Sequence, residues 1–201
     1  MKTHIAVVLD ASGSMNKIAN DTIGGYNRYL QEQQSAALPG DTWTLTLFND
    51  VSRSVITASP IVYVPELSPE TYRPMLGTAL YDAVMMSIRQ LEQLVDQDDR
   101  VLFVVITDGE ENSSKVARKE ETEKLIADKT ALGNWTFVYL GADPSGWRKD
   151  ADALSAHQTQ NTRQFAADPA GAAMAWNTVA EGTNVYRAGS DLQTKDFFAK
   201  M

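Results

Sequence analysis

Cysteine is absent from the 201-residue chain. This excludes disulfides, thiolate metal sites and catalysis by cysteine. Long hydrophobic runs are missing too: the most apolar stretch, VLFVVI at 101–106, has the length of a strand and is far too short to cross a bilayer. The sequence begins MKTHIAVVLD, with strand-like residues almost at once, so no secretory signal peptide is expected. These absences lead us to expect a cytoplasmic protein.

Basic residues are also few, with 18 Lys and Arg against 26 Asp and Glu and a net charge of −8. No basic cluster stands out, so we expect neither nucleic-acid nor membrane binding. Hydrophobic residues make up 43%, close to the globular average. We expect one domain over residues 1–190 and a C-terminal tail over 191–201, in which Phe197–Phe198 is either a docking element or packed on the domain.

Apolar stretches of strand length recur along the chain, separated by helical patterns. The segment DTWTLTLFND at 41–50 is followed closely by SVITA at 54–58, which predicts a hairpin and hence one antiparallel edge strand. Three other runs are apolar throughout, as in strands covered on both faces. These buried strands are expected at 4–10, 100–109 and 134–143, with a short edge strand at 162–167.

Helical periodicity fills the intervals between the strands. Leu80, Val84, Ile88, Leu91 and Val95 form one apolar face of a helix expected at 78–95. Other helices are expected at 17–35 with an interruption at Gly24–Gly25, at 113–132, in short form at 144–154, and at 169–187 with Asp168 as its cap. This order predicts an α/β fold: an open, doubly wound, mostly parallel sheet with one antiparallel edge strand and helices on both faces.

Acidic residues end two of the buried strands, Asp10 after HIAVVL and Asp108 after VLFVVIT. An aspartate in this place could be a nucleophile, a phosphate-site acid, a metal ligand or a helix cap. Open α/β sheets bind ligands beyond the carboxyl ends of their strands. If the two strands are neighbours, the carboxylates lie on the order of 5 Å apart, and they repel by roughly 3 kcal/mol at an effective dielectric of about 20. A proton or a cation is needed there.

Hydroxyl groups accompany these carboxylates. Ser12 and Ser14 lie on a tight turn at Gly13, and Thr78 precedes the helix expected at 78–95. Neutral oxygens beside carboxylates suit a hard divalent cation, Mg²⁺ or else Mn²⁺ or Ca²⁺. Ser14 and Thr78 would also serve as helix caps, and for either residue alone capping is the simpler interpretation. The joint pattern of five residues favours a metal site.

The same residues resemble the metal-ion-dependent adhesion site (MIDAS) of von Willebrand factor A domains, of the stand-alone bacterial or phage type. The likeness rests on the DxSxS pattern at 10–14, Gly77–Thr78 before ALYDAV, and ITDGEEN at 106–112. It implies a Rossmann-like fold and a divalent metal held by Ser12, Ser14 and Thr78, with Asp10 and Asp108 acting directly or through water. It also implies a protein partner whose Asp or Glu takes the metal's open position, by analogy an AAA+ ATPase or a multi-protein assembly. Glu110 and Glu111 are expected to form a solvated acidic loop at the rim.

Two other functions remain open from the residues alone. A Mg²⁺-dependent phosphatase or phosphotransferase would also place an aspartate after the first strand, but a second acid is usual where this chain has Ser12. The chain lacks the nucleotide-phosphate motif GxxxxGK[ST] and a GxGxxG after its first strand. Serine hydrolysis would need a base beside Ser12, but His4 is expected at the opposite end of the strand. The other possibility is a structural or virion component with an architectural metal. The expected function is therefore metal-dependent protein binding without catalysis.

Overall fold

The computed structural model describes residues 1–142, 154–155 and 158–199. In these ranges six strands form one sheet in the order β3-β2-β1-β4-β5-β6. All neighbouring strands run parallel except β2 and β3. The strands are β1 Thr3–Asp10, β2 Thr42–Phe48, β3 Ser52–Pro60, β4 Arg100–Thr107, β5 Trp135–Gly141 and β6 Thr162–Gln164.

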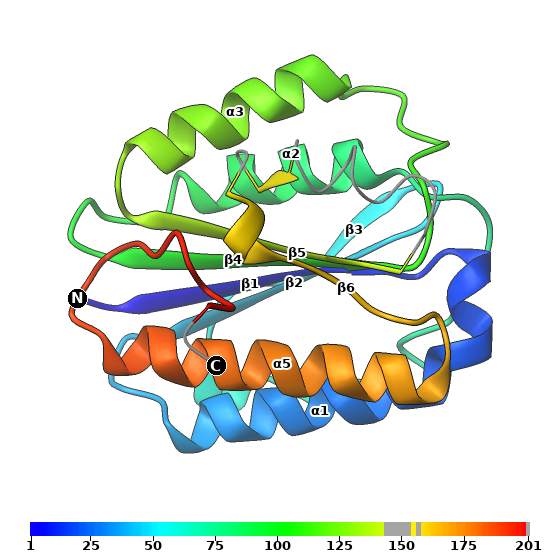
Figure 1. The fold of residues 1–201 in the computed structure, drawn as a ribbon, viewed down its shortest axis with the longest axis horizontal. Coiled ribbons are helices and arrows are strands. Elements are labelled where there is room, and N and C mark those ends of the chain that lie inside the picture. Colours follow the sequence, from blue (N-terminus) through cyan, green and yellow to red (C-terminus); the bar gives the residue numbers. More distant parts are fainter. Residues whose placement is uncertain (143–153, 156–157, 200–201) are drawn as a thin grey trace.

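Helices cover both faces of this sheet. The helices α1 Ala19–Ser35 and α5 Pro169–Ala188 lie on one face, and α2 Leu80–Leu91 and α3 Lys119–Ala131 lie on the other (Figure 1). The expected fold class is confirmed, including the antiparallel edge strand β3. The short helix expected at 144–154 lies almost wholly outside the described residues. None of the helices in the described ranges has the length and apolar character needed to cross a bilayer.

The sequence explains which strands are central. Every residue of β1, β4 and β5 is buried, as their continuous apolar runs require, whereas burial alternates along the edge strand β3. The central pair is β1 and β4, in a register that places Leu9 beside Ile106. Asp10 and Asp108 therefore follow neighbouring strands at the same edge of the sheet.

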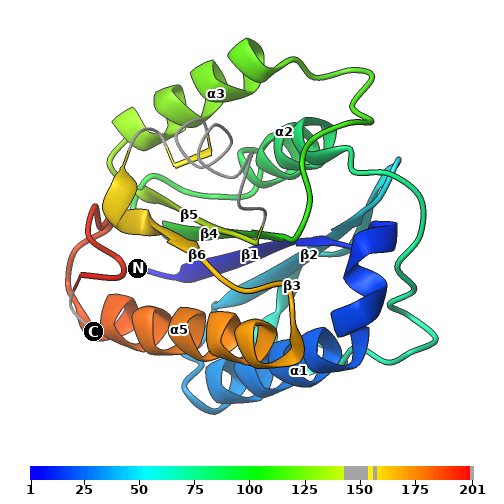
Figure 2. The same ribbon diagram turned by 45° about the vertical axis from the view of Figure 1, so that its right-hand side comes forward.

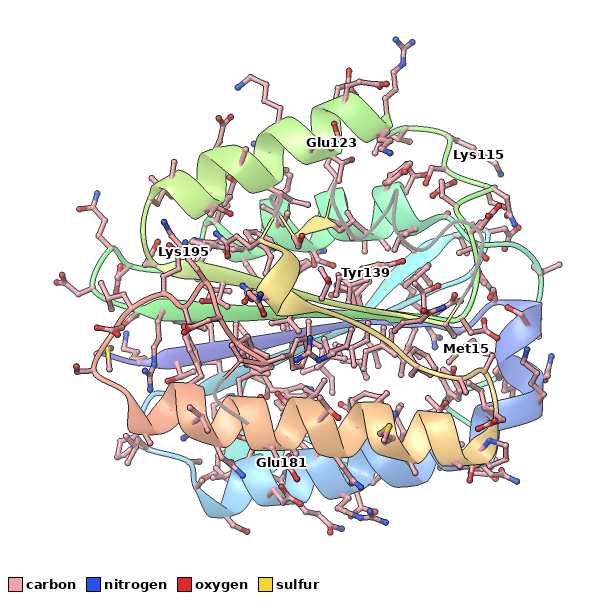
Figure 3. All side chains as sticks on the ribbon, viewed as in Figure 1. Met15, Lys115, Glu123, Tyr139, Glu181 and Lys195 are labelled. Carbon is pink, nitrogen blue, oxygen red and sulfur yellow. The ribbon has the colours of Figure 1, made fainter. Side chains whose placement is uncertain are left out.

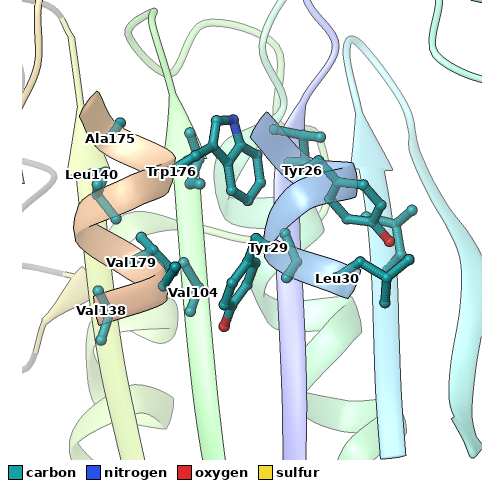
Figure 4. Packing of buried hydrophobic residues seen from close by; sticks show 14 of the residues in the cluster. Tyr26, Tyr29, Leu30, Val104, Val138, Leu140, Ala175, Trp176 and Val179 are labelled. Carbon is teal, nitrogen blue, oxygen red and sulfur yellow. The ribbon is translucent and has the colours of Figure 1, made fainter. Parts of the chain in front are cut away.

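The core between the sheet and the α1–α5 layer is rich in aromatic residues. Tyr26 and Tyr29 of α1 and Trp176 of α5 pack over the strands (Figure 4). The expected interruption of the first helix at Gly24–Gly25 is wrong, because α1 runs without a break from Ala19 to Ser35. Gly25 has a packing role instead: a Cβ there would lie 2.2 Å from Cδ1 of Trp176, so only glycine lets the two helices approach this closely.

The C-terminal segment is packed on the domain. Phe197 and Phe198 are each only 2% exposed and belong to the same core as α1 and α5. The Phe197 ring covers Gly182 of α5, and its backbone N donates to Asn161 Oδ1 at 2.8 Å. Packing, rather than availability for docking, is the role of this aromatic pair. Asp168 caps α5 as expected, its carboxylate accepting from Gly171 N at 2.8 Å.

Candidate metal centre

Asp10 ends β1 with its carboxylate fully buried. Oδ1 accepts a hydrogen bond from Ser12 N at 2.6 Å, and Oδ2 accepts from Thr107 Oγ1 at 2.5 Å. Thr107 is the last residue of the neighbouring strand β4. The carboxylate is therefore fixed across the central strand pair, and it is not a helix cap.

The turn after β1 gathers the serine hydroxyls. It leads into a 3-10 helix, Gly13–Ile18, at the carboxyl edge of the sheet, where Met15 also lies (Figure 3). Ser12 Oγ lies 3.0 Å from Ser14 Oγ, and Ser14 Oγ donates to Asp108 Oδ1 at 2.5 Å. The capping interpretation of Ser14 is wrong, because neither the 3-10 helix nor α1 has a side-chain hydrogen bond at its N-cap.

Thr78 is brought to the same place by the loop before α2. It is 3% exposed, and its Oγ1 borders Gly109: a Cβ on that glycine would lie 3.4 Å from Thr78 Oγ1 and 3.5 Å from Ser14 Oγ. The expectation that Thr78 begins a helix is wrong, because α2 begins at Leu80 and its N-cap, Ala79, forms no side-chain capping bond. The hydroxyl therefore faces the other candidate ligands instead of closing a helix end.

Asn112 positions Thr78. Its Oδ1 accepts from Thr78 N at 2.9 Å, and its backbone N donates to Thr78 O at 3.0 Å. This reciprocal pair ties the loop after β4 to the loop before α2. This role of Asn112 could not be predicted from the segment ITDGEEN, because only the fold shows that the two loops are adjacent.

The acidic loop after Asp108 is structured, which corrects the expectation for Glu111. Its carboxylate accepts from the backbone N of Tyr81, at 3.0 Å, and of Ser113 and Ser114, at 2.8 and 2.7 Å. Asp82 holds the next part of the loop by accepting from three successive backbone N–H groups, at 115–117. These bonds explain why α3 begins at Lys119, six residues later than the helix expected at 113–132.

Two further residues touch the site without having been predicted. Tyr72, 2% exposed, donates from its hydroxyl to the backbone O of Asp10 at 2.6 Å. Lys17 places its Nζ 3.7 Å from Asp108 Oδ2. Lys17 lies within the same short segment as the serines, so its position in the 3-10 turn was a usable signal. Tyr72 lies in an irregular stretch that gives no periodic signal.

Burial raises the pKa of both carboxyl groups, Asp10 and Asp108. Desolvation raises the pKa of Asp10 to about 6, against the opposing hydrogen bonds from Thr107 and Ser12. Desolvation also raises the pKa of Asp108, opposed by the Ser14 hydrogen bond and by the Lys17 ammonium. Asp108 Oδ2 is buried and lacks a hydrogen-bond partner within the described part of the chain. The Lys17 ammonium lies 3.7 Å away, so this oxygen keeps a lone pair available to a metal cation.

The donor set fits a hard divalent cation. No cluster of three or more His, Cys, Asp or Glu side chains suited to a metal occurs in the described ranges, so the two carboxylates must be completed by hydroxyls. Adjacent ligands of an octahedral Mg²⁺ with bonds of about 2.1 Å lie about 3 Å apart. The Ser12 Oγ–Ser14 Oγ separation of 3.0 Å matches this spacing. All five predicted residues, Asp10, Ser12, Ser14, Thr78 and Asp108, lie at this one edge of the sheet.

Comparisons with known proteins agree with the topology. No family model and no curated protein matches the chain. Among solved structures, a von Willebrand factor type A protein from Catenulispora acidiphila is similar at 16% identity and a TM-score of 0.59, over 90% of this chain and 42% of that one. Proximal thread matrix protein 1 of the mussel byssus, with a zinc-occupied MIDAS motif, is similar at 15% identity and a TM-score of 0.64, over 89% of this chain and 45% of that one.

A third similar structure is the von Willebrand factor domain of the type V pilus tip protein Mfa5 from Porphyromonas gingivalis. It shares 10% identity at a TM-score of 0.61, over 92% of this chain and 95% of that domain. The chain thus spans nearly the whole of this isolated domain but less than half of the two longer proteins. At these identities the likeness concerns the fold, and the chain has the fold of von Willebrand factor A domains.

Proposed function

We propose that this chain is a metal-dependent protein-binding module. The observation that carries the proposal is the meeting of two buried carboxylates and three hydroxyls at the carboxyl ends of the central strands β1 and β4. In this proposal Ser12, Ser14 and Thr78 hold a divalent cation, with Asp10 and Asp108 acting directly or through water. Mg²⁺ is the first candidate, and Mn²⁺ or Ca²⁺ would suit the same oxygen donors.

A bound cation would supply a positive centre for an acidic partner. Two aspartates balance the charge of a divalent ion, and a remaining coordination position can then accept a carboxylate of another protein. A neutral amide oxygen gains far less from the ion than a carboxylate does. The partner in this proposal therefore presents an Asp or a Glu, and an AAA+ ATPase or a multi-protein assembly is the kind of partner we would look for.

The surroundings of the serines favour binding over turnover. His4 lies at the opposite end of β1, where its ring nitrogens face Thr42 Oγ1 at 2.7 Å and Asp99 Oδ2 at 3.4 Å. The Ser14 hydroxyl donates to the carboxylate of Asp108. His4, the histidine within the described residues, lies too far from Ser14 to act as its base. We further propose a single domain over 1–190 with a C-terminal tail at 191–201, and cytoplasmic residence on the basis of the missing cysteine.

The test compares melting and peptide binding with and without metal. Millimolar Mg²⁺ is expected to raise the melting temperature relative to EDTA, and Asp10→Ala is expected to abolish this response. A peptide with one aspartate, Ac-GGDGG-NH₂, is expected to bind in Mg²⁺ but not in EDTA, and its asparagine counterpart in neither. Lys119→Ala on α3 is the control that leaves both responses intact. Identical melting curves in EDTA and in every divalent metal would refute the proposal.

A further inference from the structure

A cleft of about 430 Å³ adjoins the serine turn. One wall comes from the β2–β3 hairpin and the start of β3, and the other comes from the segment between β3 and α2. Ala11, within the DxSxS motif, and Met75 line the cleft where it meets the metal centre. The same cleft is lined by two arginines, Arg53 of β3 and Arg73 of the opposite wall.

Neither arginine is used by the fold. Both side chains are exposed, and no hydrogen bond or ion pair within the described ranges involves either guanidinium group. Two other arginines are engaged: Arg187 pairs with Asp41 at 2.7 Å, and Arg100 donates to backbone carbonyls at the end of α5. Arg73 acts on Glu70 through its charge, which, after the hydrogen bond from Ser68, helps to lower the pKa of Glu70. Two guanidinium groups without a hydrogen bond or ion pair in the described ranges thus line one cleft of a chain with a net charge of −8.

The cleft is firmly connected to the metal centre. Met75 N donates to Ala11 O at 2.8 Å, and Gly13 N donates to Leu76 O at 3.0 Å. Ala11 N in turn donates to Phe48 O of β2 at 2.7 Å. The serine turn is thus bonded to both walls, and the segment between β3 and α2 runs past the 3-10 helix (Figure 2). A ligand at the metal and a ligand in the cleft would occupy one continuous surface.

We propose that this cleft is a second anion subsite, in which Arg53 and Arg73 bind a second carboxylate of the partner. The inference rests on the proposed function, which supplies the first carboxylate. The planar guanidinium fork matches carboxylate geometry, so the pair selects for acidic side chains. Glu70 lines the same cleft, and its negative charge favours a singly charged carboxylate over a doubly charged phosphate group. The partner is therefore a segment with two acidic residues a few positions apart.

The experiment titrates the uniformly ¹⁵N-labelled protein with capped glycine peptides in Mg²⁺. The probes carry one aspartate, as in Ac-GGDGG-NH₂, or two aspartates separated by one, two or three glycines. NMR follows the side-chain Nε–Hε signals of Arg53 and Arg73, assigned from Arg53→Gln and Arg73→Gln. We expect one two-aspartate peptide to bind about fivefold more tightly than the one-aspartate peptide, the upper range for an exposed ion pair, and to shift both arginine signals.

Charge-matched variants isolate the cleft. The double variant Arg53→Gln with Arg73→Gln is expected to lose the fivefold gain and to keep both the one-aspartate affinity and the melting response to Mg²⁺. The control double variant Lys119→Gln with Lys124→Gln removes the same charge from α3 and is expected to keep the gain. Equal affinity for all peptides, arginine signals that do not move, or a gain that survives the arginine double variant would each overturn the inference.

Two further outcomes separate this inference from the proposed function. If the arginine-dependent gain persists in EDTA, the subsite is real and the metal proposal fails alone. If a phosphoserine peptide or a single-stranded oligonucleotide shifts the arginine signals at lower concentration than any aspartate peptide, the cleft is a phosphate site and the carboxylate assignment is wrong.

Discussion

Asp10→Asn tests the electrostatic strain of the metal-free centre. Asp10 ionises near its usual pKa of 3.8 in the unfolded chain and near 6 in the folded one, because folding removes its carboxylate from water. Between these values the folded state binds more protons than the unfolded state, so the free energy of unfolding falls as the pH rises through this range. At 1.36 kcal/mol per pH unit, the cost at neutral pH is at most about 3 kcal/mol.

The asparagine side chain has the same shape and remains neutral, so it escapes this cost. In EDTA at pH 7.5 we expect Asp10→Asn to be more stable than the wild type by up to about 3 kcal/mol. The advantage should shrink by about 2 kcal/mol at pH 4.5, where the folded wild type keeps its proton. Urea unfolding followed by tryptophan fluorescence at several pH values measures the difference, and the comparison cancels the titrating groups that do not interact with Asp10.

Metal addition completes the same experiment. At a hundred times its dissociation constant, Mg²⁺ should stabilise the wild type by about 2.7 kcal/mol, and it should leave Asp10→Asn almost unchanged. A wild-type stability that is flat between pH 4.5 and 8 in EDTA, with no gain in Asp10→Asn, would refute the reasoning. The carboxylate would then be satisfied by the hydrogen bonds from Ser12 and Thr107 alone.

Three further predictions concern ligation, packing and capping. Thr78→Val removes only the hydroxyl, so it should weaken the melting response to Mg²⁺ and leave stability in EDTA nearly unchanged; an equal loss in both conditions would contradict ligation. Gly25→Ala should cost about 1–3 kcal/mol in urea unfolding because its Cβ meets Trp176, whereas Gly24→Ala, which faces open space, should gain about 0.5–1 kcal/mol. Asp168→Ala should cost about 1 kcal/mol through the lost cap of α5, and a change below 0.3 kcal/mol would count against it.

The sequence was sufficient to predict the sheet, and that five residues meet at its carboxyl edge, because both depend on strong local signals. Continuous apolar runs marked β1 and β4 as buried strands, and an acid directly after each run placed both carboxylates at one edge. The antiparallel position of β3 followed from the short hairpin after β2. In each case the residues that form the recognisable sequence pattern also form the strand, strand end or hairpin that the pattern predicts.

The wrong predictions share another physical cause, which is tertiary contact that leaves no pattern in the local sequence. Gly24–Gly25 favoured a broken helix until Trp176 supplied the packing that keeps α1 continuous. Glu111 had the composition of a solvated loop, but it binds backbone N–H groups from α2 and from its own loop. Tyr72 lies in a proline-rich stretch without periodicity, so only the fold shows its hydrogen bond to Asp10. Contacts of this kind leave no local pattern, so the sequence did not reveal them.

On the proposed function, charge makes recognition conditional on the cation. The chain carries a net charge of −8, and among the described residues the metal-free centre consists of two carboxylates with one ammonium group, that of Lys17, beside Asp108. An acidic partner would meet an electrically unfavourable surface there. A bound divalent cation reverses the local sign, and the guanidinium groups of Arg53 and Arg73 extend the favourable region along the cleft. The arginines alone attract an acidic segment weakly, so the metal decides whether binding occurs and the cleft decides which acidic segment binds.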